Sequence, residues 1–315
     1  MTPRFLARLG SGVLLGLASL AALAVFCWPF LTAALLPGAL PDTVQAGVLF
    51  LAAAIAIVLA AAVVLTLFDG ASGAMFIAML GTLTAVGMIL RFLGAGFGGI
   101  ETVLILLILS GRVFGPRFGF LLGACVMVGS ALIWGGVGPW LPFQVFASGW
   151  IGAGAALLPA SRARRRARGE ERGREPGTGA WAELAMLAAY GIASAYAFGL
   201  LMNVWFWPFA VGTGTGISYD AALGVGENLR RFFAYSLVTS TLTWDTVRAI
   251  TTVLGVLLIG RPVLAALRRS PLARSRRRST SPRDDGTRRH PSTAQDAAAA
   301  PPRVPRRCAP GGEAP

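Results

Sequence analysis

Long stretches without a charged residue constrain this chain more strongly than any other feature of its sequence. Residues 9–41 and 118–161 contain no Asp, Glu, Lys or Arg, and charged residues make up only 13% of the whole chain. Soluble domains carry about 25% charged residues. A helix of about 20 apolar residues is long enough to cross the hydrocarbon core of a bilayer. The sequence therefore predicts an all-α, polytopic integral membrane protein.

Turn residues and charges divide the apolar sequence into eight predicted spans. The first run is much longer than the apolar region of a signal peptide, about 7–15 residues, so a transmembrane helix is the better interpretation. Residues 1–72 then hold two predicted helices, and residues 73–268 hold six. The tail, 269–315, has too little apolar surface to fold and is expected to be disordered. The spans are predicted within residues 9–41, 44–68, 73–90, 100–109, 118–134, 142–158, 181–205 and 232–260.

The positions of the arginines predict the orientation in the membrane. Residues 162–174 contain seven arginines and residues 261–315 contain thirteen, so these two segments hold twenty of the 28 basic residues. Cytoplasmic loops are enriched in basic residues. A loop at 159–180 and both termini are therefore expected in the cytoplasm of a plasma membrane protein. The net charge of +14 indicates a solvated cytoplasmic face that attracts anionic lipids, and no nucleic acid is expected as a partner.

The sequence offers little for catalysis or metal binding. The one histidine, His290, lies in the predicted tail, and the three cysteines show no metal-ligand spacing. The glycines near residue 96 follow no strand, and the chain has no lysine for a phosphate-binding loop. We therefore expect no metal, no cofactor and no catalytic residues.

Polar and tryptophan residues gather at the predicted outer ends of the last six spans. Ionisable groups within a membrane are costly and usually face a cavity or a partner, so these residues are candidates for ligand binding. Asp245 and Arg248 are spaced i,i+3 and could pair, either as a structural ion pair or as part of the site. The candidate ligand-binding residues are Arg91, Glu101, Trp134, Trp140, Gln144, Asn203, Trp205, Trp207, Trp244, Asp245 and Arg248.

Five segments carry a resemblance to a known family. They are AMFIA at 74–78, SGRVFGPRFGF at 110–120, GGVGPWLPFQ at 135–144, NVWFWPF at 203–209 and TSTLTWDTVRA at 239–249. With these segments, residues 73–268 resemble the substrate-binding S component of energy-coupling factor (ECF) transporters, most closely the actinobacterial, cobalamin-type members. The resemblance implies a six-helix core preceded by two additional N-terminal helices in residues 1–72, and it leaves these two helices and the tail without a counterpart.

The resemblance implies a function without catalysis. An S component captures a vitamin at its extracellular end, here with cobalamin or a related corrinoid favoured, and delivers it with a transmembrane coupling protein and two ATPase subunits. The small residues Ala74, Ala78, Gly81 and Ala85 would contact the coupling protein. Two alternatives remain open from the residues alone: an intramembrane lipid- or prenyl-modifying enzyme, and a non-catalytic membrane scaffold. The identity of the vitamin and the roles of the N-terminal helices and the tail are not determined by the sequence.

Overall fold

The computed structural model describes residues 3–35, 42–69, 73–94, 100–159, 178–212 and 214–280, which are nearly all helical and contain no strand. Contacts divide the chain into two units, Met1–Arg276 and Arg277–Pro315, and every helix up to α11 belongs to the first. The elements are α1 (Pro3–Phe26), α2 (Trp28–Leu35), α3 (Asp42–Asp69), α4 (Ala74–Gly94), α5 (Val103–Phe114), α6 (Pro116–Trp134), α7 (Leu141–Leu157), α9 (Thr178–Ala210), α10 (Val225–Ser236), the π-helical segment η1 (Leu237–Asp245), α11 (Thr246–Arg269) and α12 (Pro271–Thr280).

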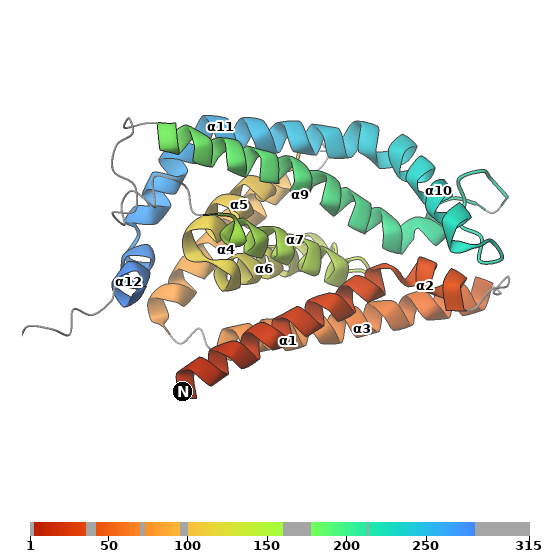
Figure 1. Cartoon of the computed structure of the whole chain (residues 1–315), viewed down its shortest axis with the longest axis horizontal. Coiled ribbons are helices and arrows are strands. Elements are labelled where there is room, and N and C mark those ends of the chain that lie inside the picture. The colour runs from red at the N-terminus through yellow and green to blue at the C-terminus, as the bar shows by residue number, and fades with distance from the viewer. Residues whose placement is uncertain are drawn as a thin grey trace, which may run out of the picture. The chain divides into compact units, whose positions relative to one another are not determined.

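Helices α5, α6 and α7 form the buried centre of the bundle. Their backbones approach closely at three glycines, because a Cβ added to Gly152 would lie 2.3 Å from the carbonyl oxygen of Gly119, and one added to Gly111 would lie 1.9 Å from that of Gly152. Small residues allow such close helix packing within a membrane. Helix α4 packs on α6 and α5, whereas α9 and α11 lie side by side and pack on α5 (Figure 1).

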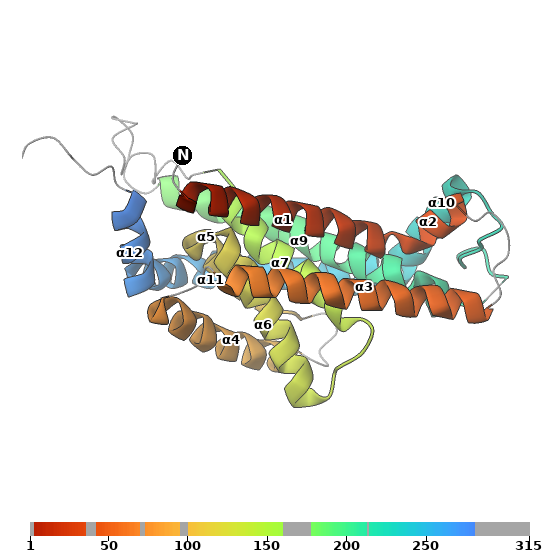
Figure 2. The ribbon, with the colours of Figure 1, turned by 90° about the horizontal axis from the view of Figure 1, so that it is seen from below.

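The N-terminal helices form a pair against this bundle. Helices α1 and α3 lie side by side and both contact α7 (Figures 1 and 2). The first predicted span is not one straight helix, since α1 ends before Cys27 and α2 continues at an angle of 69°. Pro29 explains the break, because it cannot donate a hydrogen bond to the carbonyl of Val25 and its ring crowds the preceding turn.

Each of the eight predicted spans coincides with an apolar helix. Four helices in the described part of the chain are long and apolar enough to cross a membrane, and the bent pair α1–α2 would be a fifth. Shorter apolar helices, α5, α7 and the middle of α3, coincide with the remaining three. The predicted all-α membrane fold is thus confirmed, although α5, with 12 residues, is only about 18 Å long and needs flanking residues to span.

The last two predicted spans are longer in the structure than in the prediction. Helix α9 continues to Ala210 and contains Pro208. The final helix is continuous from Val225 to Arg269 and includes η1, where the Thr246 hydroxyl donates to the carbonyl of Thr241 at 2.7 Å. With 45 residues, this helix is too long to lie entirely within the hydrocarbon core. The connection between these two helices is correspondingly shorter than the predicted loop 206–228, and its described residues are 211, 212 and 214–224.

The tail begins with a short helix. Helix α12 occupies residues predicted to be disordered, because Ser270 accepts a hydrogen bond from the backbone N–H of Ala273 and Pro271 suits the first helical position. Several predictions lie outside the described residues: the basic stretch 162–174, the glycine cluster near residue 96 and the tail beyond 280.

Candidate functional site

A group of three charged side chains, the buried Asp245 and Arg248 and the half-buried Glu101, lies where α5 and α11 begin. Arg248 donates from Nη1 to Oδ1 of Asp245 at 2.6 Å and from Nε to Oε2 of Glu101. Asp245 is fully buried and also accepts a hydrogen bond from the Ser240 hydroxyl at 3.0 Å. The i,i+3 pair predicted from the sequence is therefore present, and Glu101 joins it from 147 residues away.

Helix α9 is shaped to receive this group. A Cβ at Gly199 would lie 2.0 Å from Oδ1 of Asp245, so only glycine leaves room for the carboxylate. The Arg248 guanidinium lies over the Phe198 ring, 5.1 Å from its centroid. A buried ion pair is stable only when its geometry and remaining hydrogen bonds are well satisfied. Here two carboxylates and an aromatic face surround one guanidinium, and the Ser240 hydroxyl satisfies a further oxygen of Asp245.

Arg91 forms a second polar group at the end of α4. Its guanidinium donates to the hydroxyl of Ser130 in α6 and to Oε1 of Gln144 in α7, the latter at 3.0 Å. Within the described residues it has no carboxylate in salt-bridge contact, although the charge of Glu101 is near enough to interact with it. Thr102 links the two groups by donating to the carbonyl of Leu90 at 3.1 Å. Arg91 thus keeps donor capacity that these neutral partners do not use.

The predicted tryptophans separate into two kinds. Trp134, Trp140 and Trp244 are 45%, 41% and 49% exposed. Trp205 and Trp207 are buried, and Trp205 stacks on Phe143 with ring centroids 4.9 Å apart. The five rings therefore do not line one aromatic cavity together. The exposed three are available to a ligand or to lipid headgroups, whereas Trp205 and Trp207 hold helices together.

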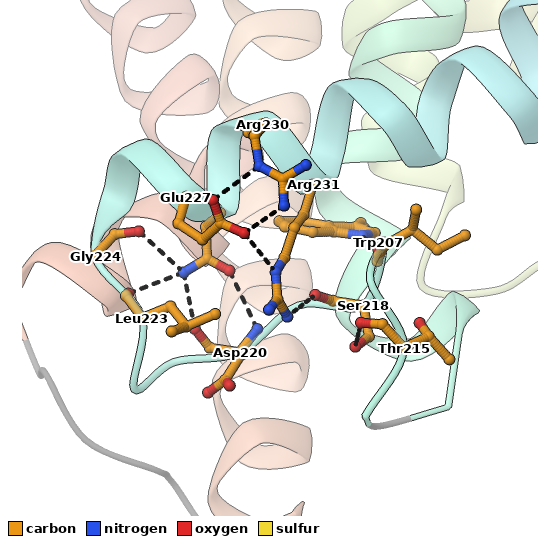
Figure 3. Close-up of polar contacts among 11 residues, drawn as sticks. Trp207, Thr215, Ser218, Asp220, Leu223, Gly224, Glu227, Arg230 and Arg231 are labelled. Atoms are coloured by element: carbon orange, nitrogen blue, oxygen red, sulfur yellow. Dashed lines mark hydrogen bonds and ion pairs between the residues drawn. The ribbon is translucent and has the colours of Figure 1, made fainter.

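Asn203 and the loop after α9 form the remaining part of this end. Asn203 donates to the hydroxyl of Ser236 at 2.8 Å and so ties α9 to α10. The buried Asn228 fixes the loop by donating to the carbonyls of Asp220 and Leu223 at 2.8 and 3.0 Å (Figure 3). Arg231 donates to the carbonyl of Ser218 at 3.3 Å while it also pairs with Glu227 (Figure 3). The loop is therefore an ordered structure that closes on the start of α10.

The predicted contact face on α4 is open. Ala74, Ala78, Gly81 and Ala85 are all exposed, and a Cβ at Gly81 would have no atom within 4 Å. The opposite face of α4 carries its buried residues, Leu80, Leu83 and Gly87. The N-terminal helices therefore leave the small-residue face uncovered.

Comparison with known families decides the identity of the core. Residues 74–260, more than half of the chain, match the family described as "ECF transporter, substrate-specific component". The chain belongs to this family. Comparisons with curated proteins and with solved structures gave no match.

As an ECF S component, the protein is the membrane-embedded substrate-binding subunit of a transporter and not an enzyme. Members of this family work with coupling and ATPase subunits. The match begins with α4, so α1, α2 and α3 lie outside the family core. Among the described residues, no group of three His, Cys, Asp or Glu side chains could hold a metal ion.

Three residues that shape this end of the S component carry no signal of their own in the sequence. Ser130 accepts a hydrogen bond from Arg91, Gly199 lies against Asp245, and Tyr219 is a buried residue of the loop after α9. Serine and glycine are common within membrane helices and usually serve only packing. Their roles follow from which helices face each other, and the sequence alone does not contain that information.

Proposed function

We propose that this S component captures a vitamin at the end of the bundle that carries Arg91, Glu101 and Arg248, with cobalamin or a related corrinoid favoured. The observation that carries the proposal is the convergence of charged and polar side chains from α4, α6, α7 and α11 at one end of an apolar bundle. Ionisable groups in such a setting are expensive and usually functional. The exposed tryptophans at 134, 140 and 244 suit a large ligand with extended ring surfaces.

The opposite end of the bundle supports an orientation with both termini in the cytoplasm. There the buried Arg112 donates to Glu183 at 3.1 Å and to the carbonyl of Leu158 at 2.7 Å, and Arg268 donates to Glu183 at 2.6 Å. This end leads into the arginine-rich loop and tail. In this orientation the positive-inside rule is obeyed and the ligand end faces outward.

Delivery to the cytoplasm would use the exposed small residues of α4. Small side chains let two helices approach closely, and in a membrane this close packing drives association. We assign Ala74, Ala78, Gly81 and Ala85 to the contact with the coupling protein, because they form an open stripe. The two ATPase subunits would act through that coupling protein and would not touch the vitamin.

Binding of cyanocobalamin to the purified protein tests this function. We expect saturable binding at one site per chain in the absence of ATP and of any partner, measured by isothermal titration calorimetry. Riboflavin and the other water-soluble vitamins form the comparison panel. Absence of binding to every member of the panel by folded protein would contradict the proposal.

The same titration tests Arg91. Replacing Arg91 by methionine should weaken binding by roughly ten- to a hundredfold, because a hydrogen bond to a charged group contributes about 1.5–3 kcal/mol. Arg261→Met is the matched control, since it also removes an arginine from a helix but one that lies over Trp181. Equal affinity in both variants would remove Arg91 from the site.

A further inference from the structure

The N-terminal extension reaches the ordered loop after α9, although it lies outside the family core. We propose that α2 anchors the loop 214–224 in its observed position and thereby limits access to the end of the bundle assigned to the ligand. That the access is access of a vitamin rests on the proposed function, whereas the anchoring of the loop by α2 does not.

Hydrogen bonds join α2 directly to the middle of the loop. The hydroxyls of Thr32 and Tyr219 lie 2.8 Å apart, and Tyr219 also donates to the carbonyl of Pro29 at 3.0 Å. Both side chains are buried. Burial raises the pKa of the Tyr219 phenol, so it stays protonated and able to donate. Unmade hydrogen bonds are costly at a buried position, so these contacts fix the loop relative to α2.

Aromatic packing reinforces this connection. Phe30 of α2 packs against Trp207 and Phe232, with ring centroids 6.0 and 5.8 Å apart. Trp28 donates from its indole N–H to the carbonyl of Trp205 at 2.9 Å. Such aromatic pairs contribute to stability beyond the burial of their surface. Helix α2 is therefore fixed to α9 and α10 as well as to the loop.

The loop is also held by hydrogen bonds to α9 and α10. Trp207 donates to the carbonyl of Ile217 at 2.8 Å, the Ser218 hydroxyl donates to the carbonyl of Thr215, and Asn228 holds the far end (Figure 3). Ser236, the partner of Asn203, is fully buried and directly follows Tyr235, which belongs to the same cluster as Tyr219 and Phe232. Release of Tyr219 from α2 would loosen this cluster and expose Ser236 to water.

The bend between α1 and α2 makes this contact possible. The axes of α1 and α2 differ in direction by 69°, so α2 does not continue along α1. Because of the bend, α1 packs on α7 while α2 turns away and contacts α10 (Figure 2). Helix α2 lies outside the residues that match the family, because the match begins at the start of α4.

Hydrogen exchange of the loop provides the first test. In Tyr219→Phe, we expect the backbone amides of residues 214–224 to exchange about tenfold faster than in the unaltered protein, because two buried hydrogen bonds are lost. Thr32→Val should give a smaller acceleration, since the Pro29 contact remains. Thr82→Val is the matched control: Thr82 also donates to a carbonyl four residues earlier but contacts no loop.

Thiol modification of Ser236→Cys by a charged methanethiosulfonate reagent provides the second test. The modification rate at position 236 is obtained by subtracting the rate of the protein that carries only its native cysteines. This rate should rise about tenfold when Tyr219→Phe is added and stay unchanged when Thr82→Val is added. Unchanged exchange in the loop would overturn the anchoring, and faster exchange with unchanged modification would overturn the control of access. Neither measurement needs a vitamin, so failure of the protein to bind cyanocobalamin would contradict only the proposed function.

Discussion

Replacing Gly81 by leucine should abolish vitamin uptake while leaving vitamin binding unchanged. A Cβ at this exposed position has no atom of the protein within 4 Å, so we expect folding and the ligand site to be unaffected. It would nevertheless stand on the open stripe of α4 and keep a partner helix from approaching. Uptake of labelled cyanocobalamin into cells that also express the coupling and ATPase subunits measures the first quantity, and calorimetry measures the second.

Gly16→Leu is the matched control for this experiment. Gly16 lies in α1, is exposed and also has open space around it, so the same side chain is added to another apolar helix. Uptake should continue in this variant. Equal uptake by the Gly81→Leu and Gly16→Leu variants would exclude the α4 stripe as the contact with the coupling protein. Loss of vitamin binding in Gly81→Leu would show instead that the stripe supports the ligand site.

Replacing Arg248 by methionine should destabilise the protein by about 3–5 kcal/mol, the usual cost of removing one partner of a buried ion pair. Asp245 is fully buried beside Gly199, and Arg248 is its one ion-pair partner among the described residues; Glu101 loses its partner at the same time. Thermal unfolding in detergent measures the change. Neutralising both carboxylates in the same chain, with Glu101→Gln and Asp245→Asn, should restore much of the loss.

Arg230→Met is the control for this loss of stability. Arg230 pairs with Glu227 at 2.6 Å, but both groups reach solvent, and exposed ion pairs contribute little. We expect unfolding of this variant to match that of the unaltered protein. A similarly small effect for Arg248→Met would contradict the structural importance of the Glu101–Arg248–Asp245 group.

The membrane fold could be predicted from the sequence because a bilayer imposes strong requirements on it. Each span needs a long apolar run, and every backbone group must be satisfied within the helix. Runs such as 118–161 leave few alternatives once a break at GGVGPWLPFQ is recognised. The pairing of Asp245 with Arg248 was equally accessible, since it depends only on helical spacing.

The contacts between helices could not be predicted in the same way. Helices such as α9 are apolar on all sides, so their sequence does not mark the face that turns inward. The stacking of Trp205 on Phe143 and the contact of Arg91 with Ser130 both depend on helix rotation. The candidate tryptophans chosen from the sequence therefore included the buried Trp205 and Trp207 as well as three exposed rings.

The contacts made by the N-terminal extension could not be predicted from the sequence either. Its two spans were evident from composition, but whether they cover α4 or lie elsewhere depends on packing. In the structure α1 and α3 contact α7, the stripe with Gly81 remains exposed, and α2 turns to the loop at Tyr219. A single span across Pro29 was predicted from the sequence, and the contact that the break allows is made with Tyr219, more than 180 residues away.

Mass spectrometry of the ligand retained by the purified protein tests the central claim most directly. The protein would be purified from cells supplied with a mixture of vitamins, and the small molecules released on denaturation would be identified and quantified. A substrate-binding subunit that captures its vitamin without ATP should release one kind of vitamin, with a corrinoid favoured, at about one molecule per chain. Folded protein that releases no vitamin, and binds none added afterwards, would contradict the assignment of this chain as a vitamin-capturing S component.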